Sequence, residues 1–73
     1  MSVVGTTVRV TVNGAESQLS AGTTVARLVA DLGRSPDGVA VAVDGEVVPR
    51  SGWADRPLAD GERVEVLAAV QGG

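Results

Sequence analysis

The chain has 73 residues, six basic and nine acidic, which gives a formal net charge of −3 and room for one small domain. It contains no Cys, His, Lys, Phe or Tyr, which excludes disulfides, Cys or Lys covalent catalysis, His general-base catalysis and His/Cys zinc sites. The acidic balance lacks the basic footprint of a nucleic-acid-binding protein, and no apolar run approaches the roughly 20 residues of a membrane span. Residues 1–4 do not read as a secretory signal, so we expect a cytoplasmic protein.

The first part of the chain predicts a β-hairpin. Residues 7–12 alternate strictly between Val and Thr or Arg, which is typical of a strand with one buried face and one wet face. Asn13-Gly14 follows at once, and this pair tolerates the positive φ angles that a two-residue hairpin turn requires. We therefore expect a second, antiparallel strand over residues 15–19.

The next segment predicts one amphipathic helix. Thr23 or Thr24 can cap its first turn, and Gly33 can end it in a left-handed conformation. Its apolar side chains fall at the i, i+3, i+4 and i+7 positions of one face: Val25, Leu28, Val29 and Leu32.

The rest of the chain predicts three short strands, which complete the order β-β-α-β-β-β. Its elements are, in order, a loop at 34–38, a strand at 39–43, a turn at 44–45, a strand at 46–48, a helical turn at 51–55, a turn at 60–61 and a strand at 62–67. This order predicts an α+β fold of the β-grasp, or ubiquitin-like, plan. We expect a mixed sheet of four to five strands, with one main helix across it and the first and last strands parallel at its centre. Residues 1–69 would form this single domain, and residues 70–73 a flexible tail.

The chain ends on Gly72-Gly73 shortly after the last predicted strand. Because two glycines place no side chain beside the terminal carboxylate, an extended tail can thread a narrow channel in another protein. Extended, the four tail residues span about 13 Å; they are Val70, Gln71, Gly72 and Gly73. The alternative is a frayed terminus without a function, but a β-grasp domain with a strand leading into the tail favours a functional one.

The chain resembles the ThiS family of ubiquitin-like sulfur carriers, most specifically between Val47 and Gly73. The likeness is carried by Val48-Pro49-Arg50-Ser51-Gly52-Trp53, Leu58, Asp60-Gly61, Val64-Glu65-Val66-Leu67 and Val70-Gln71-Gly72-Gly73. The related MoaD carriers of molybdopterin synthesis tend to be longer and to have a proline just before the tail, which this chain lacks.

The resemblance implies a protein co-substrate, not an enzyme, with no bound cofactor or metal. A ThiF-type, E1-like adenylyltransferase would use ATP and Mg²⁺ to adenylate the carboxylate of Gly73, and a cysteine desulfurase relay would supply sulfur for its thiocarboxylate. A ThiG-type thiazole synthase would then accept that sulfur for the thiamine thiazole. The free carrier is expected to be a monomer that binds neither nucleic acid nor membrane. The alternatives are a carrier for tRNA thiolation, molybdopterin or a specialised metabolite, and a β-grasp interaction module with an inert tail.

Four side chains outside the tail are candidate partner contacts: Leu67, Glu65, Arg50 and Trp53. Strand alternation points Leu67 outward and places Glu65, with Glu62, among the outward charges. Arg50 either pairs at the surface with Asp44 or Asp55 or docks to an acidic patch on an enzyme. Trp53 is either a core lid over the end of the helix or a partner contact.

Overall fold

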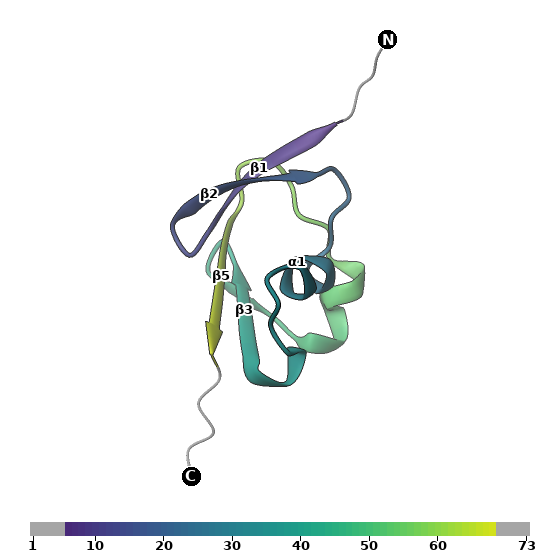
Figure 1. Cartoon of the computed structure of the whole chain (residues 1–73), viewed down its shortest axis with the longest axis vertical. Coiled ribbons are helices and arrows are strands. Elements are labelled where there is room, and N and C mark those ends of the chain that lie inside the picture. Colours follow the sequence, from purple (N-terminus) through teal and green to yellow (C-terminus); the bar gives the residue numbers. More distant parts are fainter. Residues whose placement is uncertain (1–5, 69–73) are drawn as a thin grey trace.

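The computed structural model describes residues 6–68, which form a five-stranded mixed sheet with helix α1 on one side of it (Figure 1). The elements are, in order, β1 (Thr7–Val12), β2 (Ala15–Ser20), α1 (Val25–Asp31), the 3₁₀ helix η1 (Pro36–Gly38), β3 (Val39–Val43), β4 (Glu46–Val48), the 3₁₀ helix η2 (Arg50–Asp55) and β5 (Arg63–Ala68). The strand order is β2-β1-β5-β3-β4, with β1 and β5 parallel and the other neighbours antiparallel. The β-grasp prediction is therefore confirmed, with the last strand at the centre of the sheet.

Both predicted hairpin turns have the expected backbone. Asn13 and Gly14 join β1 to β2 with φ angles of 52° and 85°, and Asp44 and Gly45 join β3 to β4 with 51° and 85°. Two consecutive positive φ angles match the right-handed twist of the flanking strands, which is why these pairs suit two-residue hairpins.

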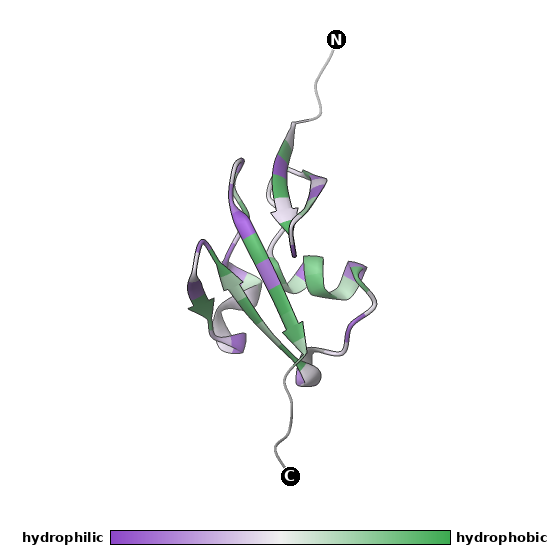
Figure 2. Cartoon of the chain, turned by 90° about the vertical axis from the view of Figure 1, so that its left-hand side faces the viewer, coloured by the Kyte–Doolittle hydropathy of each residue, from purple (hydrophilic) through white to green (hydrophobic). Residues whose placement is uncertain are grey.

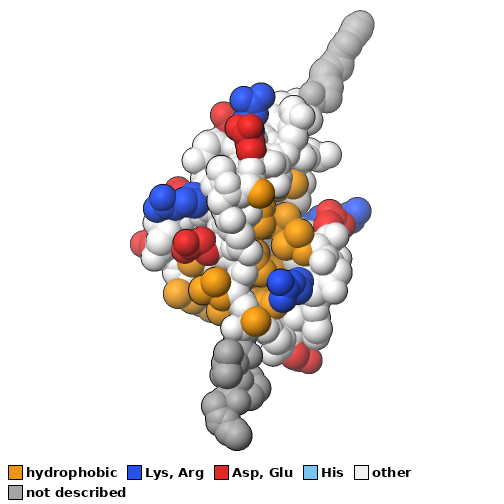
Figure 3. Space-filling model, turned by 60° about the vertical axis from the view of Figure 1, so that its left-hand side comes forward, with side chains coloured by type: hydrophobic (Ala, Val, Ile, Leu, Met, Phe, Trp, Pro, Cys, Tyr) orange, Lys and Arg blue, Asp and Glu red, His pale blue; other side chains and the backbone are white. Residues whose placement is uncertain are grey.

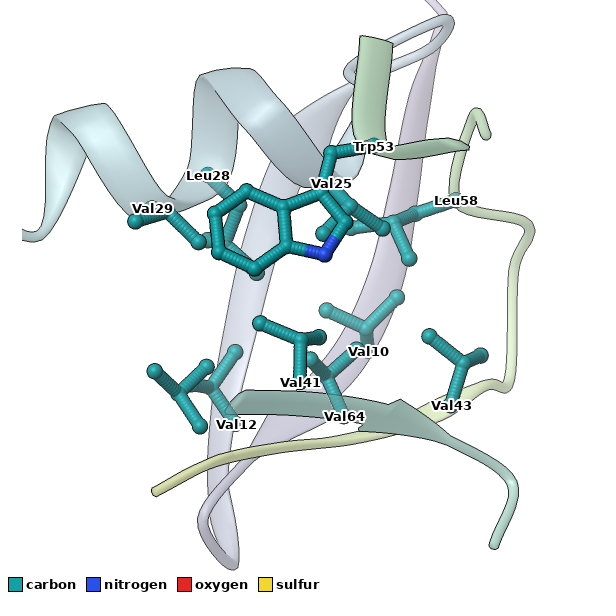
Figure 4. Close-up of a cluster of buried hydrophobic side chains, with 11 residues drawn as sticks. Val10, Val12, Val25, Leu28, Val29, Val41, Val43, Trp53, Leu58 and Val64 are labelled. Atoms are coloured by element: carbon teal, nitrogen blue, oxygen red, sulfur yellow. The ribbon is translucent and has the colours of Figure 1, made fainter. Parts of the chain in front are cut away.

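The core fills the space between α1 and one face of the sheet (Figure 4). Among residues 6–68 its buried members are all apolar: Val10, Val12, Val25, Leu28, Val29, Val41, Val43, Trp53, Leu58, Val64 and Val66. Full burial of such a side chain stabilises the fold by about 1.5–3 kcal/mol, and the sequence has no cysteine that could add a disulfide.

Helix α1 begins at the predicted N-cap and is ended as predicted by Gly33, which has a φ of 75°. Thr24 is its N-cap, and the Thr24 hydroxyl accepts a hydrogen bond from the Arg27 N–H at 3.2 Å. The helix stops at Asp31, and Leu32 takes the C-cap position with its side chain 45% exposed. The prediction that Leu32 shares the buried face is wrong: its N–H still donates to the Leu28 carbonyl at 3.0 Å, but its side chain is exposed.

The segment between η2 and β5 is tied to the start of α1. The Val25 N–H donates to the Arg56 carbonyl at 2.9 Å, and the Leu58 N–H donates to the Thr23 carbonyl at 2.8 Å. Leu58 is buried, which anchors this segment to the core.

None of the helices within residues 6–68 has the length and apolar character needed to cross a membrane.

Candidate functional site

Strand β5 runs through the middle of the sheet to Ala68, the last described residue (Figure 2). It pairs with β3 along its length, from Val43 opposite Val64 to Val39 opposite Ala68. The base of the C-terminal segment is thus part of a central strand. The predicted tail, Val70, Gln71, Gly72 and Gly73, lies outside the described residues.

Hydrophilic and hydrophobic residues alternate along the first part of β5 (Figure 2), and the burial of its side chains alternates with them. Val64 and Val66 are buried, whereas Glu65 and Leu67 face outward, and Leu67 is 59% exposed. The structure therefore places Leu67 and Glu65 on the surface that the sequence assigned to them, away from α1.

An apolar surface surrounds Leu67 on the side of the sheet opposite α1. We call it the outer face and define it by Leu67 and Glu65 of β5, Ala40 and Ala42 of β3, and Val47 of β4. Leu67 lies opposite Ala40, and Ala42 lies between Glu65 and Val47 in the register. Figure 3 shows hydrophobic side chains gathered on the lower half of this side of the molecule.

Val47 is a member of the outer face that the sequence did not single out, and its side chain is 73% exposed. The sequence feature that could have identified Val47 is its place next to Val48 in the strand 46–48. Adjacent side chains of a strand point to opposite faces, and Val48 packs against the core. Strand β4 has only three residues, too few for the alternation alone to say which valine faces outward.

Arg50 begins η2 and forms an ion pair with Asp37 of η1. The expected partners Asp44 and Asp55 are therefore wrong. The Asp44 carboxylate instead accepts a hydrogen bond from the Arg63 N–H at 2.9 Å, so it binds the backbone at the start of β5. Arg50 remains more than half exposed, so its pair with Asp37 is open to solvent.

Trp53 is a core residue. Only 4% of its surface is exposed, and its indole packs over Val25, Leu28 and Val29 of α1 (Figure 4). The indole Nε1–H donates to the Val48 carbonyl at 2.8 Å, which satisfies its one polar group. This is the core-lid arrangement, and it leaves almost no indole surface for a partner.

The prediction that Glu62 lies with Glu65 on the outward face is wrong. It precedes β5, its side chain is mostly buried, and its Oε2 lies 2.7 Å from Arg56 Nη2. Its Oε1 accepts a hydrogen bond from the Ala59 N–H at 2.7 Å. The hydrogen bond from Arg56 holds the pKa of Glu62 below its ordinary value. Glu62 is therefore part of the loop structure, and of the two predicted glutamates only Glu65 faces outward.

A mixed sheet of this strand order, with one helix across it after the first hairpin, defines a domain of the ubiquitin-like class. Comparison with known proteins gives the particular family. The family model described as "ThiS family" matches residues 2–73, and the chain belongs to this family.

Individual relatives agree with the family assignment. The chain is 33% identical over 61 residues to the sulfur carrier protein ThiS of Escherichia coli K12, with 84% of this chain and 92% of that protein covered. A crystal structure of the thiamine biosynthesis protein ThiS from Geobacter metallireducens superposes with a TM-score of 0.76 at 30% identity, covering 90% of this chain and 100% of that one. A thiazole synthase of Paramagnetospirillum magneticum is 37% identical over 65 residues, which are 89% of this chain but only 20% of that protein.

The chain is thus a ThiS sulfur carrier for thiamine thiazole biosynthesis, and it is a protein co-substrate, not an enzyme. Carriers of this family bind no cofactor. The family assignment favours this function over the alternatives of carriers for other sulfur pathways and of an inert interaction module.

Proposed function

We propose that the carboxylate of Gly73 carries the sulfur, and that Val70, Gln71 and Gly72 thread it into the active sites of partner enzymes. The observation that carries this proposal is the family match through Gly73, combined with a central strand that reaches Ala68 five residues earlier. The chain offers no thiol, imidazole or amine side chain, so a main-chain carboxylate is consistent with its composition.

Sulfur loading needs activation, because a terminal carboxyl with a pKa of about 3.5 is ionised at pH 7 and is a poor electrophile. A ThiF-type adenylyltransferase would bind ATP and Mg²⁺. An oxygen of the Gly73 carboxylate attacks the α-phosphorus, and pyrophosphate leaves. A protein persulfide, charged by a cysteine desulfurase relay, then displaces AMP from the acyl-adenylate. A thiol of the partner cleaves the resulting S–S bond, which leaves a thiocarboxylate on Gly73 and a disulfide on the partner.

The outer face is the surface that we assign to partner docking. It is apolar around Leu67 and Val47, and the small side chains of Ala40 and Ala42 between them leave the sheet accessible to a flat partner surface. Glu65 adds one negative charge within it. Because Leu67 is six residues from Gly73 in the sequence, a partner that holds this face is close to the tail.

Arg50 is a second contact that we assign to a partner. Its exposed guanidinium can form a bidentate interaction with a carboxylate of an enzyme. The exposed pair with Asp37 is weak enough to be exchanged for that interaction.

A ThiG-type thiazole synthase is the acceptor that we propose for the sulfur. A stretch similar to this chain occupies a fifth of a protein named thiazole synthase, which supports an association between the carrier and such an enzyme. We also place the carrier in the cytoplasm, because the activation that we propose for Gly73 consumes ATP.

Intact-mass measurement tests the proposal. Incubation with a ThiF-type enzyme, Mg·ATP and a protein persulfide should add the mass difference between sulfur and oxygen to the full-length chain. A chain that lacks Gly73 is the matched control and should stay unchanged. An unshifted full-length chain, in a reaction that loads the E. coli relative, would contradict the proposal.

A further inference from the structure

The side-chain amide of Asn13 binds both backbone groups of Val66, 53 residues away in the sequence. Its Nδ2 donates to the Val66 carbonyl at 3.0 Å, and its Oδ1 accepts from the Val66 N–H at 2.8 Å. The hairpin turn requires only a residue that tolerates a φ of 52°, which Gly or Asp also does. The two bonds to β5 are therefore a second role of Asn13.

These bonds continue the parallel pairing of β1 and β5 beyond the end of β1. Thr11 and Val12 lie opposite Arg63 and Val64, and the Asn13 N–H donates to the Val64 carbonyl at 2.9 Å. After Asn13 the chain reverses into β2. The amide of Asn13 thus takes the place of the peptide group that a longer β1 would present to Val66.

The consequence is that β5 is held on both edges close to its end. Asn13 holds Val66 on the β1 side, and on the other side β3 pairs Ala40 with Leu67 and Val39 with Ala68. A strand end fixed in this way has a defined direction at Ala68, from which the last five residues follow.

We propose that Asn13 is a positioning residue for the carrier tail, because it fixes the end of β5 from which the Gly73 carboxylate is presented to a partner. This inference rests on the proposed function of Gly73. A tail that starts from a fixed strand end loses less conformational freedom when it enters an active site. Loosening Val66 should therefore raise the KM for the carrier and leave kcat almost unchanged.

Asp44 offers a matched control at the other end of the same strand. It holds the equivalent turn position, with a φ of 51°, and its Oδ1 accepts from the Arg63 N–H. Asn13→Gly and Asp44→Gly both keep the left-handed backbone accessible, and both remove side-chain hydrogen bonds to β5. Only Asn13→Gly does so beside the tail.

The kinetic test is ATP–pyrophosphate exchange by a ThiF-type enzyme with each full-length carrier as the varied substrate. Asn13→Gly should raise the KM by between about twofold and about tenfold, where tenfold is the limit set by losing one to two hydrogen bonds within the carrier, with kcat changed less than about twofold. Asp44→Gly should change the KM less than about twofold. Asn13→Asp keeps the acceptor for the Val66 N–H but places a carboxylate oxygen against the Val66 carbonyl, so it should also raise the KM relative to Asp44→Gly, and it carries the comparison if Asn13→Gly does not fold.

Hydrogen exchange of the Val66 amide, measured by NMR on the free carrier, provides a readout that needs no partner enzyme. Asn13→Gly should speed this exchange about tenfold relative to Asp44→Gly, because local opening near Val66 becomes easier. Equal KM values or equal Val66 exchange rates in the two glycine variants would overturn the inference alone. A wild-type chain that is not adenylated at all would overturn the proposed function and this inference together.

Discussion

Arg56 and Glu62 form a two-point ion pair across the loop that leads into β5. Arg56 Nη2 lies 2.7 Å from Glu62 Oε2, and Nη1 lies 3.4 Å from Oε1. The side chain of Glu62 is 15% exposed and that of Arg56 36%, whereas the other ion pairs of residues 6–68 have both side chains more than half exposed. Since the Arg56 carbonyl also accepts from Val25, the pair connects the start of α1 with the approach to the central strand.

Replacing Glu62 with Gln should lower the free energy of unfolding by about 1 kcal/mol at pH 7, because Arg56 loses a partly screened charged partner. Arg56 lowers the pKa of Glu62 in the folded state, so the ionised carboxylate stabilises the fold above its unfolded-state pKa of roughly 4.3. That contribution is lost as the pH falls through the lower folded-state pKa.

Urea denaturation of wild type and Glu62→Gln at pH 7 and pH 3 checks this expectation. The stability difference should shrink in acid, and a difference independent of pH would contradict it. Glu16→Gln is the control. Glu16 lies 3.7 Å from Arg9 with both side chains exposed, so its loss should cost less than about 0.5 kcal/mol.

Trp53→Ala should lower the free energy of unfolding by about 3–5 kcal/mol, because it removes the indole from the core and leaves a cavity under η2. Trp53→Phe should cost less, since it keeps an aromatic ring and loses the hydrogen bond to the Val48 carbonyl. Thermal or urea unfolding measures both. Unchanged stability of Trp53→Ala together with weakened partner binding would instead make Trp53 a partner contact.

Leu67→Ser should weaken binding to a ThiF-type or ThiG-type partner about tenfold, if the outer face is the docking surface. Its effect on the free energy of unfolding should stay within about 0.5 kcal/mol, because Leu67 is largely exposed. Leu32→Ser, an exposed leucine at the end of α1, is the control and should leave binding unchanged. Calorimetric titration that finds both variants equally tight would remove Leu67 from the interface.

Arg50→Ala and Asp37→Ala separate a partner contact from a surface ion pair. Both variants break the exposed pair and should lower the free energy of unfolding by less than about 1 kcal/mol. Only Arg50→Ala should raise the KM for the carrier in adenylation, whereas Asp37→Ala leaves the guanidinium free for the enzyme. If the two variants have the same KM, Arg50 is no partner contact.

Local patterns were sufficient to predict most of the fold. Strict alternation over residues 7–12, the two glycine-containing turns and the helical spacing of Val25, Leu28 and Val29 each report on a few neighbouring residues, and each was confirmed. The outward position of Leu67 follows from the same period of two. By contrast, the exposure of Leu32 was not predicted, because its spacing fits the buried face although it lies at the C-cap, directly before Gly33, which ends the helix.

Contacts between distant side chains could not be predicted in the same way. The pairing of Arg50 with Asp37 depends on how η1 and η2 meet, and Asp44 is occupied by the backbone of β5. Glu62 turns inward because the loop before β5 closes on Arg56, which no alternation within a strand describes. The contact of Asn13 with Val66 arises only once β1 and β5 are adjacent.

Fragmentation of the sulfur-loaded carrier in a mass spectrometer tests the central claim most directly. After reaction with a ThiF-type enzyme, Mg·ATP and a protein persulfide, the added mass should lie in C-terminal fragments that contain Gly73, and every fragment without Gly73 should keep its original mass. A chain without Gly73 should remain unmodified while its unfolding curve matches that of the full-length protein. Sulfur located on any other residue, or loading that persists without Gly73, would contradict the assignment of Gly73 as the carrier group.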